Sequence, residues 1–405
     1  MALHDNFFEY WSKRQQVIRH KVAVYEAVTN FEEQDGLKVG DTAHRPYRSA
    51  LSVNTVGTGG SYVRQSISVT DEYLIVNVKK ETTFYLEDAD AIQSSYRDAN
   101  FFADDAIKKL TNWIDGDVLG EYDQADSKIG NYEMGGGGSA GDGIGFTLTT
   151  SNILNLFGKA RKKLDALNID QNNRWAVISP EFFDILWQFL AGKESNLGDT
   201  TGKNGNVGSY GGFTLYKSNA CGWSARLEFG TNPTANDTVT INGVTWTFKA
   251  APAAAGEVDI GADAAASLDL LVAAVNNSNG YAAEAGSATT YYEVTATNRL
   301  LLQGITATNA TTAMTVKGEG VGYCAVSEGL TAAADIWTTT MQIQHVLFGQ
   351  GKPTDLIVQK TPKLEIFHRD GYIGKDHVNW IMYGLKTFDE GDALLCDCQI
   401  RSDAF

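Results

Sequence analysis

Between residues 63 and 122 the spacing of apolar residues changes from the period of a strand to that of one long helix. Apolar and polar residues alternate up to residue 87, and the acids that follow favour a helix N-terminus, at Glu87, Asp88 and Asp90. Apolar residues then recur three and four positions apart, at Ile92, Tyr96, Ala99, Ala103, Ala106, Leu110 and Ile114. A helix over 88–122 would span about 50 Å. That length suits a spine better than a compact domain, and Gly116 is a candidate for a bend or an early end.

The segment before this helix is predicted to form a long two-stranded excursion. One strand covers 63–69, where Val63, Gln65, Ile67 and Val69 alternate with polar residues, and a second strand follows in YLIVNVKKETTFYL. We place the turn between them at Thr70, Asp71 and Glu72. Two strands alone are marginal in water, so the excursion is expected to lean on another chain.

The next part of the chain predicts an α/β domain that begins with a glycine-rich loop at 130–145. Thr150 or Ser151 is expected to cap a helix that runs to Leu167. In RWAVISPEFFDILWQFL, a buried strand precedes Ser179 as helix cap and Pro180 as first helical residue. A strand at Phe213–Tyr216 follows, and the residues after 336 return to the same alternation of apolar strands.

The composition changes between residues 229 and 335, where there are ten acidic residues and only three basic ones, Lys249, Arg299 and Lys317. Asn242-Gly243 between two alternating runs is a strong hairpin signal. A helix is expected from Ala264 to Val275. Three further strands are expected, around Tyr292–Ala296, Arg299–Gln303 and Met314–Val316. The order is interpreted as β-β-α-β-β, a small module inserted into the α/β domain.

Sequence patterns that suggest catalysis or metal binding are all outweighed by simpler explanations. The letters G-x-S-x-G at 137–141 lack the flanking strand and helix of a nucleophile elbow. His368-Arg369-Asp370 has Lys375 where a kinase catalytic loop needs asparagine. Cys396 and Cys398 are expected to pack in a core rather than bind metal. We therefore predict no enzyme activity, no cofactor and no metal site.

Charge and cysteine content limit the location and partners of the chain. The net charge of −16 argues against general binding of nucleic acid, whose phosphates attract Lys and Arg. Four scattered cysteines indicate folding in a reducing cytosol. The first residues, MALHDNFFEYWSKRQQ, are unlike a signal peptide, and no stretch predicts a membrane span.

The order of these parts resembles the major capsid proteins of tailed bacteriophages. YVRQSISVTDEYLIVNVKKETTFYL is similar to the extended E-loop, DADAIQSSYRDANFFADDAIKKLTNWIDGDVL to the spine helix, and RWAVISPEFFDIL with GFTLYKSN to the axial domain. The resemblance implies an α+β fold with an N-terminal arm, an E-loop hairpin, a peripheral domain with the spine, an axial α/β domain and the β-β-α-β-β insertion. The expected boundaries are 1–35 arm, 36–87 E-loop and peripheral strands, 88–129 spine, 130–228 axial domain, 229–335 insertion and 336–405 closing part.

The resemblance also implies a function through self-assembly. Copies would form hexamers and pentamers of an icosahedral virion shell around a double-stranded DNA genome, after synthesis in the host cytoplasm. Further expected partners are a scaffolding protein, a portal and a decoration protein, with little specific binding of DNA and no membrane. Charged residues expected at contacts between subunits are Arg64, Lys79, Lys80, Lys13, Arg14, Asp104 and Asp105.

Two alternatives remain open at this point. An encapsulin-like nanocompartment shell shares the fold but encloses a cargo enzyme. A surface glycan-binding protein would act through the insertion, with aromatic residues as a sugar platform, although aromatics on alternating strands are more often core. The platform would comprise Trp246, Phe248, Tyr291 and Tyr292.

Overall fold

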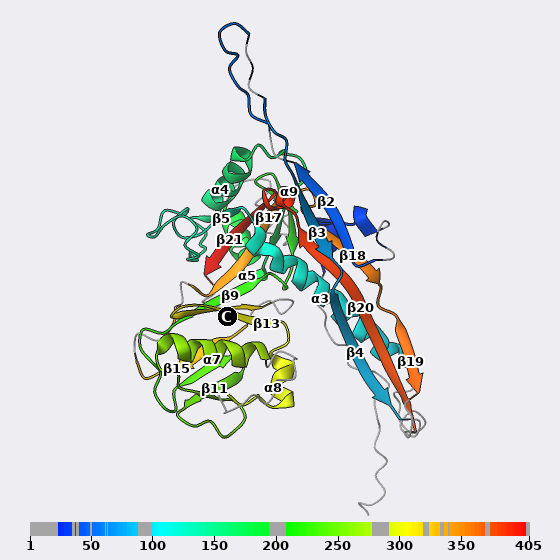
Figure 1. Ribbon diagram of the computed structural model, residues 1–405, viewed down its shortest axis with the longest axis vertical. Helices are drawn as coiled ribbons and strands as arrows, with labels where there is room; N and C mark the ends of the chain where they lie inside the picture. The colour runs from blue at the N-terminus through cyan, green and yellow to red at the C-terminus, as the bar shows by residue number, and fades with distance from the viewer. Residues whose placement is uncertain are drawn as a thin grey trace, which may run out of the picture.

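A computed structural model gives the arrangement of the chain (Figure 1). It describes residues 23–34, 37, 40–48, 51–60, 62, 64–87, 99–193, 208–277, 291–318, 324–332, 336–338, 341–368 and 373–401. A narrow hairpin projects at one end, a long twisted sheet runs diagonally, and a central sheet carries helices beside a smaller α/β module.

The diagonal sheet is built around the long strand β20 (Lys375–Thr387). β4 (Val78–Leu86) pairs with one edge of β20, and β18 (Thr354–Lys360) and β19 (Leu364–His368) with the other, all antiparallel. β1 (Thr29–Asn30) adds a parallel partner to β18. It follows α1 (Tyr25–Val28) and precedes the 3-10 helix η2 (Glu32–Gln34).

The long predicted helix is present as α3 (Ala99–Gly120), which packs on this sheet. Its 22 residues span about 33 Å. The predicted start at 88–98 lies outside the described residues. The expected early end at Gly116 is wrong, because the helix continues to Gly120, and the expected bend there stays a prediction. Another 3-10 helix, η3 (Glu121–Gln124), follows directly.

The projecting hairpin pairs different segments from those expected. β3 (Val69–Ile75) is antiparallel to β2 (Thr42–Arg48), so Arg45 lies opposite Glu72 and Tyr47 opposite Thr70. The turn predicted at Thr70–Glu72 is therefore wrong. Residues 64–68, expected to be a strand, have no strand assignment and lead back from the tip. The actual partner of β3 is β2, which contains Pro46. Proline weakens the strand signal of a sequence, so this segment was not predicted as the partner.

Ten strands of the described chain form the central sheet. Its middle is β17 (Ile343–Gln350), flanked by β21 (Leu395–Arg401), β6 (Arg174–Ile178) and β9 (Trp223–Glu228). The remaining strands extend its edges: β8 (Phe213–Lys217), β7 (Ser209–Tyr210), β5 (Ser127–Ile129), β14 (Ala313–Gly318), β13 (Ile305–Ala310) and β16 (Ile336–Trp337).

Two helices cover one face of this sheet, α4 (Ile153–Ala166) and α5 (Pro180–Ala191). Ser179 caps α5 as predicted, since its Oγ accepts a hydrogen bond from the Phe182 N–H. The cap predicted for α4 is wrong, because Asn152 holds the N-cap position. The Asn152 side chain instead bonds the backbone of the preceding loop, at Thr147 and Thr149. Cys396 and Cys398 are fully buried in the core beneath these helices.

The module formed by residues after 229 contains a four-stranded sheet and a helix. β10 (Thr238–Ile241) and β11 (Val244–Lys249) make the predicted hairpin, with positive φ at Asn242 and Gly243. β12 (Glu257–Asp259), β15 (Val326–Gly329) and α7 (Ala264–Asn277) complete it. The strand predicted at Arg299–Gln303 is wrong, because Thr295 caps a short helix there, α8 (Ala296–Leu301). The strand expected around 292–296 reduces to an isolated bridge at Tyr291.

This module shares its core with the central sheet. Trp223, Ala225 and Leu227 of β9 lie in one hydrophobic cluster with Val239 and Leu271. β14, which lies within 229–335, pairs directly with β9. The stretch is thus continuous with the central sheet, and its separate status as an inserted domain stays a prediction.

Candidate functional site

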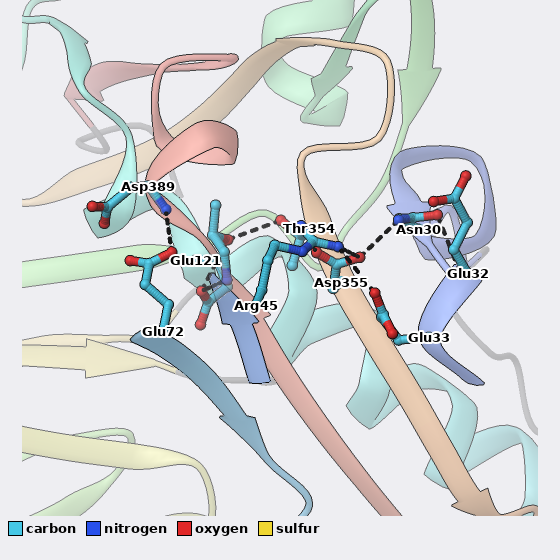
Figure 2. Close-up of polar contacts among 10 residues, drawn as sticks. Asn30, Glu32, Glu33, Arg45, Glu72, Glu121, Thr354, Asp355 and Asp389 are labelled. Carbon is cyan, nitrogen blue, oxygen red and sulfur yellow. Dashed lines mark hydrogen bonds and ion pairs between the residues drawn. The ribbon is translucent and has the colours of Figure 1, made fainter. Parts of the chain in front are cut away.

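The root of the projecting hairpin is held by a charged cluster centred on Asp355 (Figure 2). Arg45 Nη1 lies 2.9 Å from Asp355 Oδ2, and Asn30 Nδ2 donates to Asp355 Oδ1 at 2.7 Å. Arg45 also approaches Glu33 at 3.6 Å and stacks over the Phe388 ring at 4.4 Å. Burial raises the pKa of the Asp355 carboxyl, and the Arg45 charge offsets part of that rise. One arginine thus joins β2, β18 and the chain around β1.

A second set of contacts joins β20 to η3, and the hairpin root to the short helix α9 (Asp389–Asp392). The Glu121 carboxylate accepts hydrogen bonds from Thr387 N–H at 3.3 Å and Thr387 Oγ1 at 3.1 Å. Glu72 of β3 accepts from the Asp389 N–H at 3.4 Å. Burial raises the pKa of Glu121, and burial with the nearby Asp389 raises that of Glu72. The Glu72–Asp389 contact thus ties β3 to α9 beside the root.

The N-terminal segment is anchored by a carboxylate of the long helix. Asp115 is fully buried, and its Oδ1 accepts hydrogen bonds from Val24 N–H at 2.7 Å and Tyr25 N–H at 2.8 Å. Ser218 Oγ donates to its other oxygen at 3.2 Å. Asp115 therefore serves contacts within the chain, unlike the exposed Asp104 of the same helix. Asp117 also bonds within the chain, because it accepts from the Tyr383 hydroxyl.

The tip of the hairpin is apolar and exposed, whereas its root is charged and partly buried. Figure 1 shows it extending well beyond the body of the molecule. Its apolar side chains are exposed, and Val53 is fully so, with a relative accessible area of 102%. The other exposed apolar residues are Leu51, Val56, Tyr62, Ile67 and Val69. A monomer rarely leaves such a row of apolar groups in water without a partner.

The contact residues proposed from sequence are scattered over the molecule. Arg64 is exposed on the returning side of the hairpin, Lys79 is exposed on β4, and Asp104 is exposed on α3. Two others have contacts within the chain: Lys80 Nζ lies 4.3 Å from the centre of the Trp113 ring, and Asp105 pairs with Lys109 at 3.1 Å. Lys13 and Arg14 lie outside the described residues.

A buried hydrogen-bonded chain of Ser224, His345 and Asp397 was not predicted. Ser224 Oγ lies 2.8 Å from His345 Nε2, and His345 Nδ1 lies 2.9 Å from Asp397 Oδ1. This is the order of a nucleophile, base and acid. However, all three residues are buried within the central sheet, and the Tyr122 ring stacks on His345 with centroids 3.5 Å apart. We interpret it as a polar network that joins three strands to the end of α3.

The other residues considered for catalysis or sugar binding do not form such sites. Ser139 lies in an exposed loop, where its N–H donates to Asp142 Oδ2 at 2.9 Å, without the strand and helix of a nucleophile elbow. Trp246 and Phe248 are fully buried in the module core, so the sugar platform that included them is wrong. His368 ends β19, and the rest of that motif lies outside the described residues.

Comparison with solved structures places this arrangement among phage capsids. A structure from Mycobacterium phage Che8 has a TM-score of 0.58 and 12% identity, and covers 98% of both chains. The capsid structure of cyanophage P-SCSP1u has a TM-score of 0.55 and 14% identity over 98% of this chain and 93% of that one. The bacteriophage PhiM1 mature capsid has a TM-score of 0.52 and 10% identity, and the match covers 98% of this chain and 93% of that one.

The chain therefore has the fold of phage capsid subunits, which confirms the α+β fold class expected from the resemblance. No protein-family model matches the sequence, and no curated protein matches it. In the part of the chain that the structure describes, no helix is both long and apolar enough to cross a membrane.

Proposed function

We propose that this chain is the major capsid protein of a tailed phage, a non-enzymatic subunit that builds an icosahedral shell around double-stranded DNA. The observation that carries the proposal is the match to phage capsid structures over 98% of the chain. The exposed apolar tip on a rigid root supports it, because a neighbouring copy would cover the tip.

Assembly follows from many weak contacts multiplied over a closed lattice. Hexamers and pentamers would form the shell, with a scaffolding protein, a portal and a decoration protein as further partners. The virion capsid would be its location after synthesis in the host cytoplasm. Arg64, Lys79 and Asp104, exposed in the subunit, are the described members of the proposed contact set that remain free to meet a neighbour.

Electron microscopy of the purified wild-type protein tests this proposal. We expect shells, tubes or capsomers, and loss of these assemblies when Leu51, Val53 and Val56 are all changed to serine. Particles that contain genome-length DNA would support the phage shell. Particles of fixed small size with an enzyme inside would indicate an encapsulin-like compartment instead. A protein that stays monomeric under all conditions would contradict both.

A further inference from the structure

The outward face of α4 carries a row of cations in an otherwise acidic chain. Four of the helix residues are basic, at Lys159, Arg161, Lys162 and Lys163, whereas its buried face packs on the central sheet through Ile153, Leu156, Phe157, Ala160 and Leu164. The helical period therefore directs the basic residues away from the core.

Two nearby carboxylates already have partners. Glu133 pairs with Lys163 at 3.6 Å, and Asp165 pairs with the buried Arg174 at 2.6 Å. Among the described residues, no carboxylate forms an ion pair with Lys159, Arg161 or Lys162. We call these three residues the α4 cation row.

The α4 cation row borders one open hollow and one shallower depression of the surface. One hollow of about 610 Å³ is lined by Lys159, Lys162 and the half-exposed Tyr132. A second, of about 530 Å³, lies on the other side of Lys162 and is lined by Arg161. A projecting acidic loop or helix end would have room to enter.

The same chain carries such an acidic end at the hairpin root. Glu72, Asp126 and Asp389 surround Asp392, whose Oδ1 is buried and has no hydrogen-bond partner in the described structure. We call these four residues the root acid cluster. In the described part of the chain none of them forms an ion pair, and none contacts the α4 cation row. The charge of Lys386 lowers the pKa of Glu72 and Asp392 and so offsets part of the negative charge of the cluster, but no ion pair of the described chain neutralises either surface.

We propose that the α4 cation row of one copy binds the root acid cluster of the next copy. This inference rests on the proposed function, and it names one contact of the shell. Two complementary surfaces at different places on one chain make a heterologous contact, which closes into a ring when the rotation between copies allows. The contact would also fix the hairpin root of one subunit against the central domain of its neighbour.

A second copy fits the α4 cation row better than nucleic acid does. The net charge of −16 applies to every copy of the chain, so local charge decides between the two partners. Glu133 stands at the edge of the larger hollow and would face any phosphate placed there. A copy of the chain instead offers a small acidic end whose charge is opposite to that of the cation row.

Charge reversal tests the contact. The double variant Arg161→Glu, Lys162→Glu and the double variant Asp126→Lys, Asp389→Lys should each raise the protein concentration needed for assembly about tenfold. Combining both should restore assembly. Lys108→Glu, exposed on α3, is the matched control and should assemble as the wild type does. Melting temperatures of the Arg161→Glu, Lys162→Glu variant and of the control should stay close to that of the wild type, because their changed side chains are exposed. The Asp126→Lys, Asp389→Lys variant should melt no lower than the wild type, because it removes two of the charges that raise the pKa of Asp392.

Carbodiimide cross-linking of assembled protein gives the direct readout. Mixing light and isotope-labelled copies should yield mixed-mass links between Lys159 or Lys162 and the root acid cluster. Wild-type shells without such links, normal assembly of the reversed variants, or tight binding of a DNA oligonucleotide that these variants abolish would overturn the contact while leaving the shell function intact. Wild-type protein that never assembles would overturn the proposed function and the contact together.

Discussion

The root and the tip of the projecting hairpin have opposite chemistry on the same pair of chain segments. At the root, Arg45 and Asp355 hold β2 against the body through charge-assisted bonds. At the tip, Leu51, Val53 and Val56 are exposed and contact little of their own chain. Under the proposed function, the Arg45–Asp355 contact at the root serves the stability of one subunit, and the apolar tip serves contacts between subunits.

The largest effect on subunit stability is expected from Arg45→Ala. It leaves the buried Asp355 carboxylate without its cation, and we expect the free energy of unfolding to fall by about 2–3 kcal/mol, less than for a fully buried pair because Arg45 is part-exposed. Urea denaturation measures this change in the free energy of unfolding. Arg48→Ala, on the same strand but exposed, is the control and should stay within about 0.5 kcal/mol. Equal losses in the two variants would contradict the special role of the root.

A smaller loss is expected when the N-terminal anchor is removed. Asp115→Ala deletes the acceptor of the Val24 and Tyr25 N–H groups, and should cost about 1–3 kcal/mol. Hydrogen exchange should rise selectively at residues 24–28. Asp104→Ala, exposed on the same helix, is the matched control. Unchanged exchange at 24–28 in the Asp115 variant would show that other contacts hold the segment.

The root acid cluster predicts a pH dependence. Burial, followed by the charges of Asp126, Asp389 and Glu72, raises the pKa of Asp392 from 3.8 to about 6. Between these values the folded state binds more protons than the unfolded state, so this group lowers stability as pH rises through that range. Its unfavourable contribution is fully present above about pH 6.

Asp392→Asn isolates this contribution. The variant should equal or exceed the wild type in stability at pH 7, and its advantage should shrink as the pH falls to 5. Urea titrations at the two pH values give the difference. An advantage that grows on acidification would contradict the sign of the pKa shift.

The smallest effect on stability is expected at the tip. Leu51→Ser, Val53→Ser and Val56→Ser together should leave the subunit's free energy of unfolding within about 0.5 kcal/mol, because these side chains are already in water. Assembly, measured by light scattering, should be strongly reduced. A clear loss of subunit stability would show that the tip folds back on its own body, and would break the contrast with the root.

Local patterns in the sequence predicted the elements that depend on neighbouring residues. The period of three and four along α3, the Ser179-Pro180 start of α5 and the Asn242-Gly243 turn were all confirmed. One error arose where a distant strand decided the outcome, and another where a local helix cap outweighed the apolar alternation. β3 runs through the predicted turn at 70–72 because β2 pairs with it there, and Arg299 lies in a helix that Thr295 caps.

The sequence by itself determined α3, the start of α5 and the β10–β11 hairpin, since these follow from apolar spacing, caps and turn residues. Only the tertiary structure decided the partners of the charged residues. Arg45 meets Asp355, Asp115 meets Val24, and His345 meets Asp397, over separations of 310, 91 and 52 residues. Periodicity shows that a side chain faces inward, but it carries no information about which remote group lies opposite.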